Sequence, residues 1–236
     1  MENWTYNEFK HCGVDYSDVN QAAQYDKKHN RFRDYEKEVN YLINELSLHN
    51  SKNLTLIDLG CGTGAFAINA SKYFKKIYAV DVAEAMIHQA KQKMDPHNTN
   101  ITFINSGFLC YEHNGEPADI VITSAALHHL PDFWKQIALI RINKMLKLNG
   151  IFYLFDIVFQ FESKDYKKKI NDYITDFVAK AGDDFKSEVE IHIRDEFSTF
   201  DWIMKGLITN AGFKIEKSRS NDGFSTEYFC VKDHDI

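Results

Sequence analysis

The chain has 236 residues and a net charge of −6, and its 44% hydrophobic and 26% charged residues are typical of a globular protein. The length suits one α/β domain with an elaboration, and the acidic balance excludes a nucleic-acid footprint spread over the whole surface. Four widely spaced cysteines without a Cys-x-x-Cys pair predict neither a zinc site nor a disulfide framework. A polar N-terminal stretch and the lack of any long apolar run predict a cytoplasmic protein without a membrane segment.

Residues 1–30 are polar and aromatic without clean periodicity, and apolar positions at helical spacing then predict a helix over 31–48. Strands and helices alternate after that point. The expected strands cover 55–59, 77–80, 101–104, 120–123 and 151–155, and the expected helices cover 65–74, 83–94 and 133–146. Charged segments of helical period fill 158–199, and a helix is expected at 200–211. The segments GFKIEKSRS and FSTEYFCVK flank an Asn-Asp-Gly turn, which predicts a β-hairpin.

Nearly continuous apolar strands between helices are typical of a parallel sheet that is covered on both faces. We therefore expect an α/β, Rossmann-like three-layer sandwich. Its seven-stranded, mostly parallel sheet should end in a C-terminal antiparallel hairpin, whereas a dinucleotide-binding fold more often continues with a sixth parallel strand.

Three glycines, Gly60, Gly62 and Gly64, follow the first expected strand and precede a helix. Glycine lets the backbone approach a ligand closely, and the helix N-terminus offers free N–H groups. This pattern alone also satisfies a permissive dinucleotide fingerprint. Asp58, two residues before the loop, would repel a pyrophosphate but attract an ammonium group. S-adenosylmethionine meets this requirement, because it carries an α-amino group, a sulfonium and an adenosine but no phosphate.

The second expected strand ends at Asp81, a position from which a carboxylate accepts hydrogen bonds from both hydroxyls of an adenosine ribose. Asp81 selects a ribose and does not identify the cofactor. Val82 and Met86 are placed to line the adenine, although packing of the following helix on the sheet explains Met86 equally well.

Four segments together carry a resemblance to a known family: DLGCGTG (58–64), YAVDVAEAMIHQAK (78–91), ADIVITSAALHHL (118–130) and LKLNGIFYLFD (146–156). They resemble the successive motifs of class I S-adenosylmethionine-dependent methyltransferases, in the small-molecule branch related to ubiquinone and menaquinone biosynthesis. The chain is also similar to small uncharacterised bacterial methyltransferases with this terminal hairpin. The resemblance covers residues 20–156 well and 195–232 loosely. It implies S-adenosyl-L-methionine as the cofactor, S-adenosyl-L-homocysteine as the product and no metal.

The resemblance assigns cofactor contacts by position. The residues that it places near the methionine part and the ribose are Gly60, Cys61, Gly62, Gly64 and Asp81. The family often has an acid after the third strand that contacts the adenine amino group, whereas this chain has Ser106, Gly107 and Phe108 there. Gly107 and Phe108 are therefore expected to hold adenine through backbone groups and ring contact, since one neutral hydrogen bond contributes only about 0.5–1.5 kcal/mol.

The stretch TSAALHHLPD follows the fourth expected strand, and ligands of open α/β sheets bind beyond the carboxyl ends of strands. Thr123, Ser124 and Ala125 should thus lie near the reacting methyl group, with Ser124 in contact with the cofactor. The stretch lacks the Asn/Asp-Pro-Pro-aromatic tetrad of enzymes that methylate amino groups of nucleic-acid bases. Together with the acidic charge, this favours a small-molecule acceptor. Asp132 is expected to be the N-cap of the next helix.

Methyl transfer depends mostly on alignment and desolvation, because the sulfonium is already an activated leaving group. No catalytic residue is therefore assigned, and the remaining candidates are His128, His129 and Tyr25. One of the two histidines is a possible general base, and a packing role explains the pair as well. A shared metal is not expected, because adjacent side chains point in different directions.

The domain expectation is a single methyltransferase domain over 1–236, with an N-terminal helical lid at 1–48 and a helical insert at 158–199 that covers the acceptor side. The run QYDKKHNRFRDYE resembles the lid helix of the family, and the lid candidates for contact with ligands are Tyr16, Tyr25, Asp26 and His29. Three alternatives stay open: an RNA or protein methyltransferase with a basic groove beside 123–130, an NAD-dependent oxidoreductase, and a non-catalytic cofactor-binding relative. The expected partner is a small molecule, without membrane or nucleic acid, and the protein is expected to be a monomer or homodimer.

Overall fold

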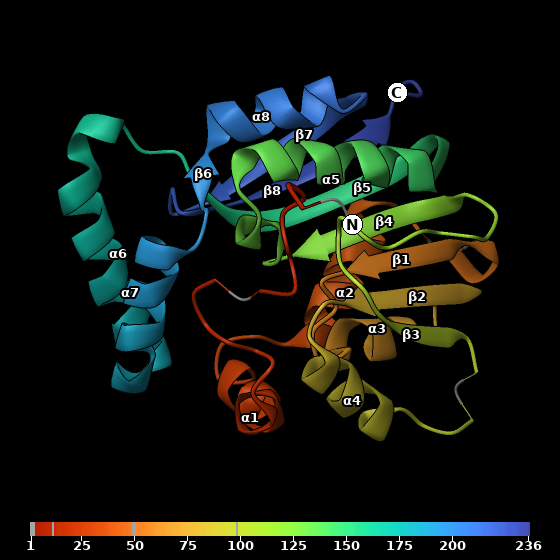
Figure 1. Ribbon diagram of the computed structural model, residues 1–236, viewed down its shortest axis with the longest axis horizontal. Helices are drawn as coiled ribbons and strands as arrows, with labels where there is room; N and C mark the ends of the chain where they lie inside the picture. Colours follow the sequence, from red (N-terminus) through yellow and green to blue (C-terminus); the bar gives the residue numbers. More distant parts are fainter. Residues whose placement is uncertain (1–2, 11, 49–50, 98) are drawn as a thin grey trace.

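The computed structural model describes residues 3–10, 12–48, 51–97 and 99–236, and it places one sheet between two layers of helices (Figure 1). Five strands run parallel, namely β1 (Thr55–Leu59), β2 (Lys76–Asp81), β3 (Ile101–Asn105), β4 (Ala118–Ser124) and β5 (Leu146–Phe159). The hairpin of β7 (Phe213–Asn221) and β8 (Ser225–Lys232) joins β5 through the antiparallel strand β8. The main path has the order β3-β2-β1-β4-β5-β8-β7, which confirms the expected mostly parallel sheet with a C-terminal antiparallel hairpin, although the sheet has eight strands and not the expected seven.

Two strand features differ from the expectation. The short strand β6 (Thr199–Phe200) pairs with the end of β5 and lies off the main path of the sheet. Strand β5 also continues four residues past the predicted end at residue 155. It continues because β8 pairs with it through Ile157 and β6 pairs with it from Val158 onward.

Helices cover both faces of the sheet. On one face lie α2 (Tyr35–Glu45), α3 (Ala65–Ala70) and α4 (Glu84–Lys93), and on the other lie α5 (Asp132–Met145) and α8 (Asp201–Asn210). Adjacent strand residues alternate between the two cores, as Leu56 and Ile57 of β1 do, because successive side chains in a strand point to opposite faces. Helix α3 ends earlier than predicted, where the Ser71 hydroxyl donates to the Ile68 carbonyl and competes with the helical pattern.

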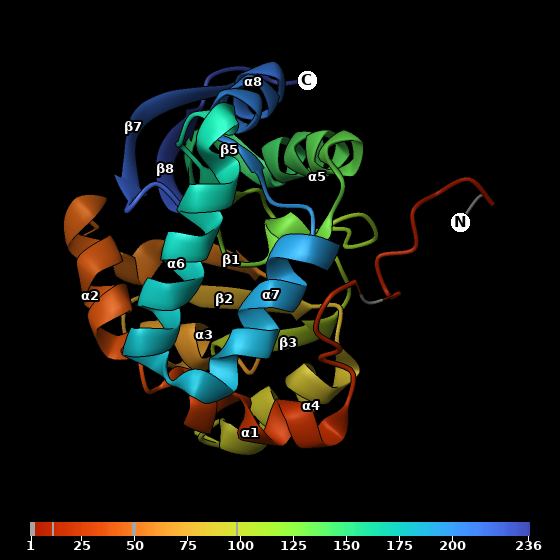
Figure 2. The same ribbon diagram turned by 90° about the vertical axis from the view of Figure 1, so that its left-hand side faces the viewer.

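Three further helices, α1 (Val19–His29), α6 (Tyr166–Ala181) and α7 (Lys186–Asp195), lie beyond the carboxyl ends of the strands, and Figure 2 shows α6 and α7 in front of those ends. Short 3-10 turns complete the chain at η1 (Ser51–Asn53), η2 (Leu127–His129), η3 (Ser163–Asp165) and η4 (Asp183–Phe185). Among the described residues, no helix combines the length and the apolar character needed to cross a membrane.

Two local predictions were wrong. The run QYDKKHNRFRDYE is not one helix, because α1 ends at His29 and the carboxylate of Asp34 caps a new helix by accepting from the Lys37 N–H. Asp132 is the first residue of α5 and not its N-cap, a position that Pro131 occupies. The Asp132 carboxylate instead accepts from the buried ammonium of Lys135 at 2.7 Å.

Candidate active site

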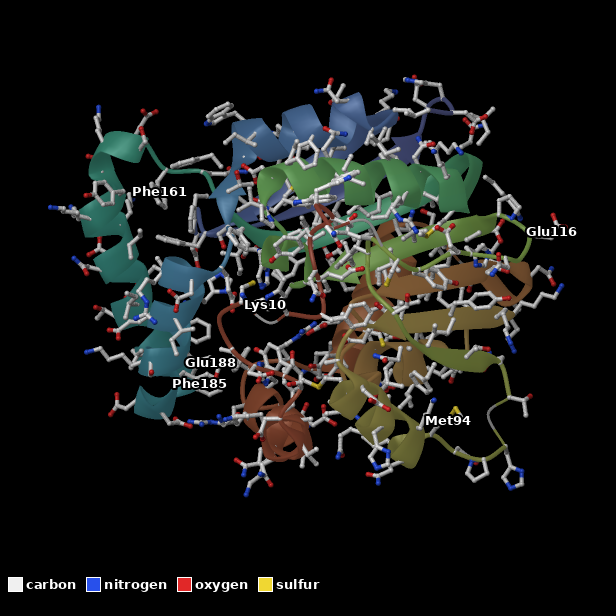
Figure 3. All side chains as sticks on the ribbon, viewed as in Figure 1. Lys10, Met94, Glu116, Phe161, Phe185 and Glu188 are labelled. Atoms are coloured by element: carbon white, nitrogen blue, oxygen red, sulfur yellow. The ribbon has the colours of Figure 1, made fainter. Side chains whose placement is uncertain are left out.

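A cavity of about 1100 Å³ lies at the carboxyl ends of β1, β2 and β4, beneath α1, α6 and α7. Figure 3 shows three of its lining residues around this space. Lys10 lies on the N-terminal segment, Phe185 directly precedes α7, and Glu188 lies in the first turn of α7. Ten of the eleven predicted cofactor residues line it, namely Asp58, Gly60, Cys61, Gly62, Asp81, Val82, Met86, Gly107, Phe108 and Ser124. The eleventh, Gly64, is not among the lining residues.

The three glycines of the loop have different roles. All have positive φ, at 77° for Gly60, 54° for Gly62 and 72° for Gly64, where a side chain is unfavourable. A Cβ on Gly64 would lie 2.6 Å from Cε1 of Phe103, so this glycine permits α3 to pack closely. A Cβ on Gly60 would lie 2.3 Å from the Cβ of Ala126. A Cβ on Gly62 would meet no atom within 4 Å, so its absence leaves space inside the cavity.

Asp58 is a buried carboxylate at the inner wall of the cavity. Its side chain is 3% exposed, and within the described part of the chain its Oδ2 atom has no hydrogen-bond partner. Burial, together with the nearby Asp81, raises the pKa of Asp58 to about 7, although Arg33 acts in the opposite direction. A cation in the cavity would supply the missing partner and favour the ionised form.

Backbone groups hold Asp81 in place at the end of β2. The Gly62 N–H donates to its Oδ2 atom at 2.7 Å, and the Ala83 N–H donates to its Oδ1 atom at 2.8 Å. A carboxylate has about four acceptor sites, so these two hydrogen bonds orient Asp81 toward the cavity without preventing further ones. Val82 and Met86 lie beside it in the cavity wall, and Met86 also packs against Ala22 of α1.

The acid that the loop after β3 lacks in sequence is replaced in space by Glu8. Both of its carboxylate oxygens accept from the Leu109 N–H at 3.0 Å, and a Cβ on Gly107 would lie 2.3 Å from the same carboxylate. Burial raises the pKa of Glu8. Glu8 lines the cavity next to Gly107 and Phe108, and the sequence analysis missed it because it lies about a hundred positions away along the chain.

Helix α1 is attached directly to the glycine loop. The Thr63 hydroxyl donates to Asp26 Oδ1 at 2.5 Å, and Lys93 of α4 forms an ion pair with the other oxygen. Tyr25 lines the cavity and stacks on His29, with ring centroids 3.7 Å apart. Tyr16 lines the cavity as well, whereas Asp26 acts through its contact with the loop.

Arg33 is a second residue that the sequence analysis did not assign. It lines the cavity, forms an ion pair with Glu38 at 2.6 Å, and lies 3.4 Å from the Ser124 hydroxyl. Ser124 and Ala125 line the cavity as predicted, and Ala125 has a positive φ of 52°, which is uncommon for alanine. Thr123 is fully buried and is not part of the cavity wall, which corrects its expected place near the methyl group.

The part of the cavity wall around η2 contains a buried cluster of histidines and acids. His128 Nδ1 contacts Asp156 Oδ1 at 2.5 Å, and His128 Nε2 lies 3.3 Å from Glu196 Oε2. Glu196 also forms an ion pair with His192, one helical turn earlier. The rings of His128 and His129 lie side by side with centroids 4.4 Å apart, so the expectation that adjacent side chains point in different directions is wrong here.

The two adjacent histidines differ in their electrostatics. Burial opposes protonation of His128, but Asp156 and Glu196 outweigh it and raise the pKa of this residue. Burial and the neighbouring His128 lower the pKa of His129 to about 3, so His129 stays neutral at physiological pH. As a general base, His129 is therefore weak, and His128 is already engaged by two carboxylates.

Carboxylates outnumber lysines and arginines among the described residues that line the cavity. In the segment 123–130, His128 contacts Asp156 and Glu196, and Ser124 lies 3.4 Å from Arg33. The sequence indicates Glu196 and His192 only through their spacing of four residues in a segment of helical period. Asp156 had a weaker indication, because it directly follows the expected strand at 151–155.

Comparison with known proteins finds similarity to methyltransferases. A methyltransferase-domain model matches residues 56–150. A carboxy-S-adenosyl-L-methionine synthase of Nautilia profundicola is 29% identical over 188 residues, 76% of this chain and 78% of that protein. The methyltransferase YrrT of Bacillus subtilis is 22% identical over 191 residues, 81% of each chain. The crystal structure of magnesium protoporphyrin IX methyltransferase from Synechocystis with bound S-adenosylmethionine superposes with a TM-score of 0.60 at 15% identity, over 93% of this chain and 98% of that one.

Proposed function

Because this chain is an S-adenosylmethionine-dependent methyltransferase, we propose that it transfers the methyl group to a small-molecule acceptor bound in the cavity beneath α6 and α7. The observation that carries the proposal is the size of this cavity, about 1100 Å³. Pockets for one ligand typically have about 300–1,000 Å³, so the cavity has room for the cofactor and a second small molecule. The excess of carboxylates along its wall disfavours a polyanionic acceptor such as RNA.

Each part of the cofactor is assigned to a residue of the cavity wall, starting at the glycine loop. Asp58 binds the α-amino group, because its buried Oδ2 atom has no hydrogen-bond partner among the described residues. Gly62 leaves the space for the methionine part, and Asp81 accepts from the ribose hydroxyls. Glu8 accepts from the adenine amino group, in the role that the family gives to an acid after the third strand.

The residues around the transferred methyl group act by positioning. Ser124 and Ala125 lie at the end of β4, where ligands of such sheets bind, and they border the space between the glycine loop and α7. Tyr25, Phe32 and Phe185 place aromatic surface along the same cavity and exclude water from it. Alignment and desolvation supply the catalysis, since the lowered pKa of His129 makes it a weak base and His128 is engaged by Asp156 and Glu196.

Two segments would control access to the acceptor. The N-terminal lid (1–48) contributes Tyr16 and Tyr25, and the insert (158–199) contributes Phe177, Phe185 and Glu188. Arg31 pairs with Asp184 at 2.8 Å and so connects the two segments. Acceptor specificity is thus assigned to these segments, and cofactor binding to the sheet edge below them.

The test has two stages. Calorimetry with S-adenosylhomocysteine should show saturable binding by the wild-type protein, and the Asp58→Asn variant serves as the matched control with weaker binding. The protein is then incubated with methyl-labelled cofactor and with separated small-molecule, RNA and protein fractions of a cell extract. Label in the small-molecule fraction supports the proposal, and label confined to RNA or protein contradicts it. A modified sulfonium that retains its labelled methyl group would instead indicate the reaction named for the Nautilia relative.

A further inference from the structure

Three metal-binding side chains converge on the acceptor side of the cavity. His128 and His129 lie in the 3-10 turn η2 after β4, and Glu196 follows the last residue of α7. Each offers one ligand atom, and these atoms all lie within 4.8 Å of one another. Two segments that are far apart in sequence thus bring two imidazoles and one carboxylate to the same point of the cavity wall.

The ring of His128 is oriented by a carboxylate on one nitrogen, as the rings of metal-bound histidines commonly are. Its Nδ1 atom contacts the buried Asp156 carboxylate at 2.5 Å, which leaves Nε2 facing Glu196 at 3.3 Å. A carboxylate on the far nitrogen fixes the orientation of a metal-bound ring and raises its basicity. His129 has a similar outer contact, since Cys12 Sγ lies 3.8 Å from its Nδ1 atom.

The balance of charge in the cluster also favours a cation. Asp156 is fully buried, and Glu196 is 9% exposed. Two carboxylates at this depth are costly unless positive charge compensates them. A divalent ion bound by Glu196 and by neutral imidazoles compensates both carboxylates at once. The simpler alternative is a purely structural network in which His128 is protonated between Asp156 and Glu196.

We propose that His128, His129 and Glu196 bind a first-row divalent metal ion such as Zn²⁺, with a further coordination position open to the cavity. Two imidazoles with one carboxylate suit zinc, iron or cobalt better than magnesium or calcium, which prefer oxygen ligands. A tetrahedral zinc with bonds of about 2.1 Å places its ligand atoms about 3.4 Å apart, so small side-chain rotations would close the site.

The open position indicates the role of the ion. Three protein ligands with a vacant fourth position are typical of catalytic rather than structural zinc. An ion at this place would bind the acceptor through a hydroxyl or thiol group and lower the pKa of that group, so that its proton passes to solvent. The resulting anion would take the methyl group as the bond from sulfur to methyl breaks, and S-adenosylhomocysteine would leave. This step rests on the proposed function, whereas the binding of the ion itself does not.

The experiment uses full-length protein without a histidine tag, treated with chelator and dialysed. Co²⁺ is added in steps and followed by visible absorption, and Zn²⁺ is then used to displace it. We expect saturation at one ion per chain. The His129→Ala and Glu196→Gln variants should lose this site, and Asp156→Asn should weaken it about 10–100-fold through the outer contact. The His88→Ala variant, which removes an exposed histidine on α4, should bind as the wild type does.

Binding of S-adenosylhomocysteine is measured on the same preparations. Its retention in His129→Ala and Glu196→Gln shows that these variants are folded. Failure to saturate with Co²⁺ or Zn²⁺ in a wild type that binds S-adenosylhomocysteine would overturn the metal site and leave the methyltransferase proposal intact. Metal binding that is equal in the wild type and in both ligand variants would overturn it as well.

Discussion

The Thr63 hydroxyl donates a hydrogen bond of 2.5 Å to Asp26 Oδ1, and this contact joins the N-terminal helix α1 to the glycine loop. Thr63 is 2% exposed, so the hydrogen bond is shielded from water. Helix α1 and the glycine loop are therefore directly connected, and under the proposed function a disturbance of either one should affect cofactor binding.

The Thr63→Val variant tests this unit, because valine keeps the shape and removes the hydroxyl. A hydrogen bond to a charged group contributes about 1.5–3 kcal/mol. In a protein of this size about 1 kcal/mol shifts the melting temperature by about 2–4 °C, so we expect a loss of several degrees and weaker binding of S-adenosylhomocysteine. The control is Thr209→Val in α8, which removes a hydroxyl that donates to the Lys205 carbonyl far from the cavity. Equal affinity of the two variants for S-adenosylhomocysteine would show that α1 does not support the loop.

Asp58 should make cofactor binding depend on pH. Its pKa in the folded protein is about 7, above the ordinary value of 3.8. Only the ionised form attracts an ammonium group, so the affinity for S-adenosylhomocysteine should rise up to about tenfold between pH 6 and pH 8. Asp58→Asn should bind more weakly and lose this rise. Calorimetry across the pH range measures both, and an equally steep rise in the variant would assign the effect to another group.

The Asp58 carboxyl group should also make the stability of the ligand-free protein depend on pH, but here the stability should fall as the pH rises. A carboxyl whose folded pKa is raised contributes stability that is fully present below its unfolded pKa and is lost as the pH rises through its folded pKa. For Asp58 this loss should occur between about pH 4 and pH 7, the window set by its two pKa values. Denaturant unfolding of the wild type and of Asp58→Asn should show a smaller decline in the variant over that window. Parallel curves would contradict the assignment.

Gly62→Ala and Gly64→Ala should separate binding from folding. Both positions have positive φ, which costs about 1–3 kcal/mol for alanine. A Cβ on Gly64 also collides with Phe103 and Ala90, so Gly64→Ala should lower the melting temperature more. A Cβ on Gly62 meets open space in the cavity. Gly62→Ala should therefore lower cofactor affinity more than Gly64→Ala does, although it lowers the melting temperature less. Calorimetry measures the affinity of both variants for S-adenosylhomocysteine, and thermal melts measure their stability. The prediction is wrong if the same variant shows the larger loss in both measurements.

Glu8 should recognise the adenine amino group. S-adenosylhomocysteine should bind more tightly than its inosine analogue, which carries an oxygen in place of that amino group and would face the Glu8 carboxylate with an acceptor. In Glu8→Gln the preference should shrink, because the amide offers a donor to the oxygen. The binding free energies of the two ligands to the wild type and to Glu8→Gln form a double-mutant cycle. An unchanged preference in the variant would move adenine recognition away from Glu8.

The mostly parallel sheet with its terminal hairpin and the positions of most helices could be predicted from the sequence, because parallel strands buried on both faces are continuous apolar runs. The ends of elements were predicted less well where a tertiary partner determines them. Strand β5 continues to Phe159 because β8 and β6 pair with its last residues, and both partners lie far from that boundary in the sequence.

For the site, the sequence by itself determined the cofactor, since the glycine loop, Asp58 and Asp81 lie within 24 positions at the ends of two adjacent strands. Local chemistry was sufficient there, because the carboxyl ends of adjacent parallel strands always meet at one edge of a sheet. The rest of the cavity wall was decided only by the tertiary structure. Glu8, Arg33 and Glu196 reach the cavity from distant segments, and their charges act through space and not along the chain.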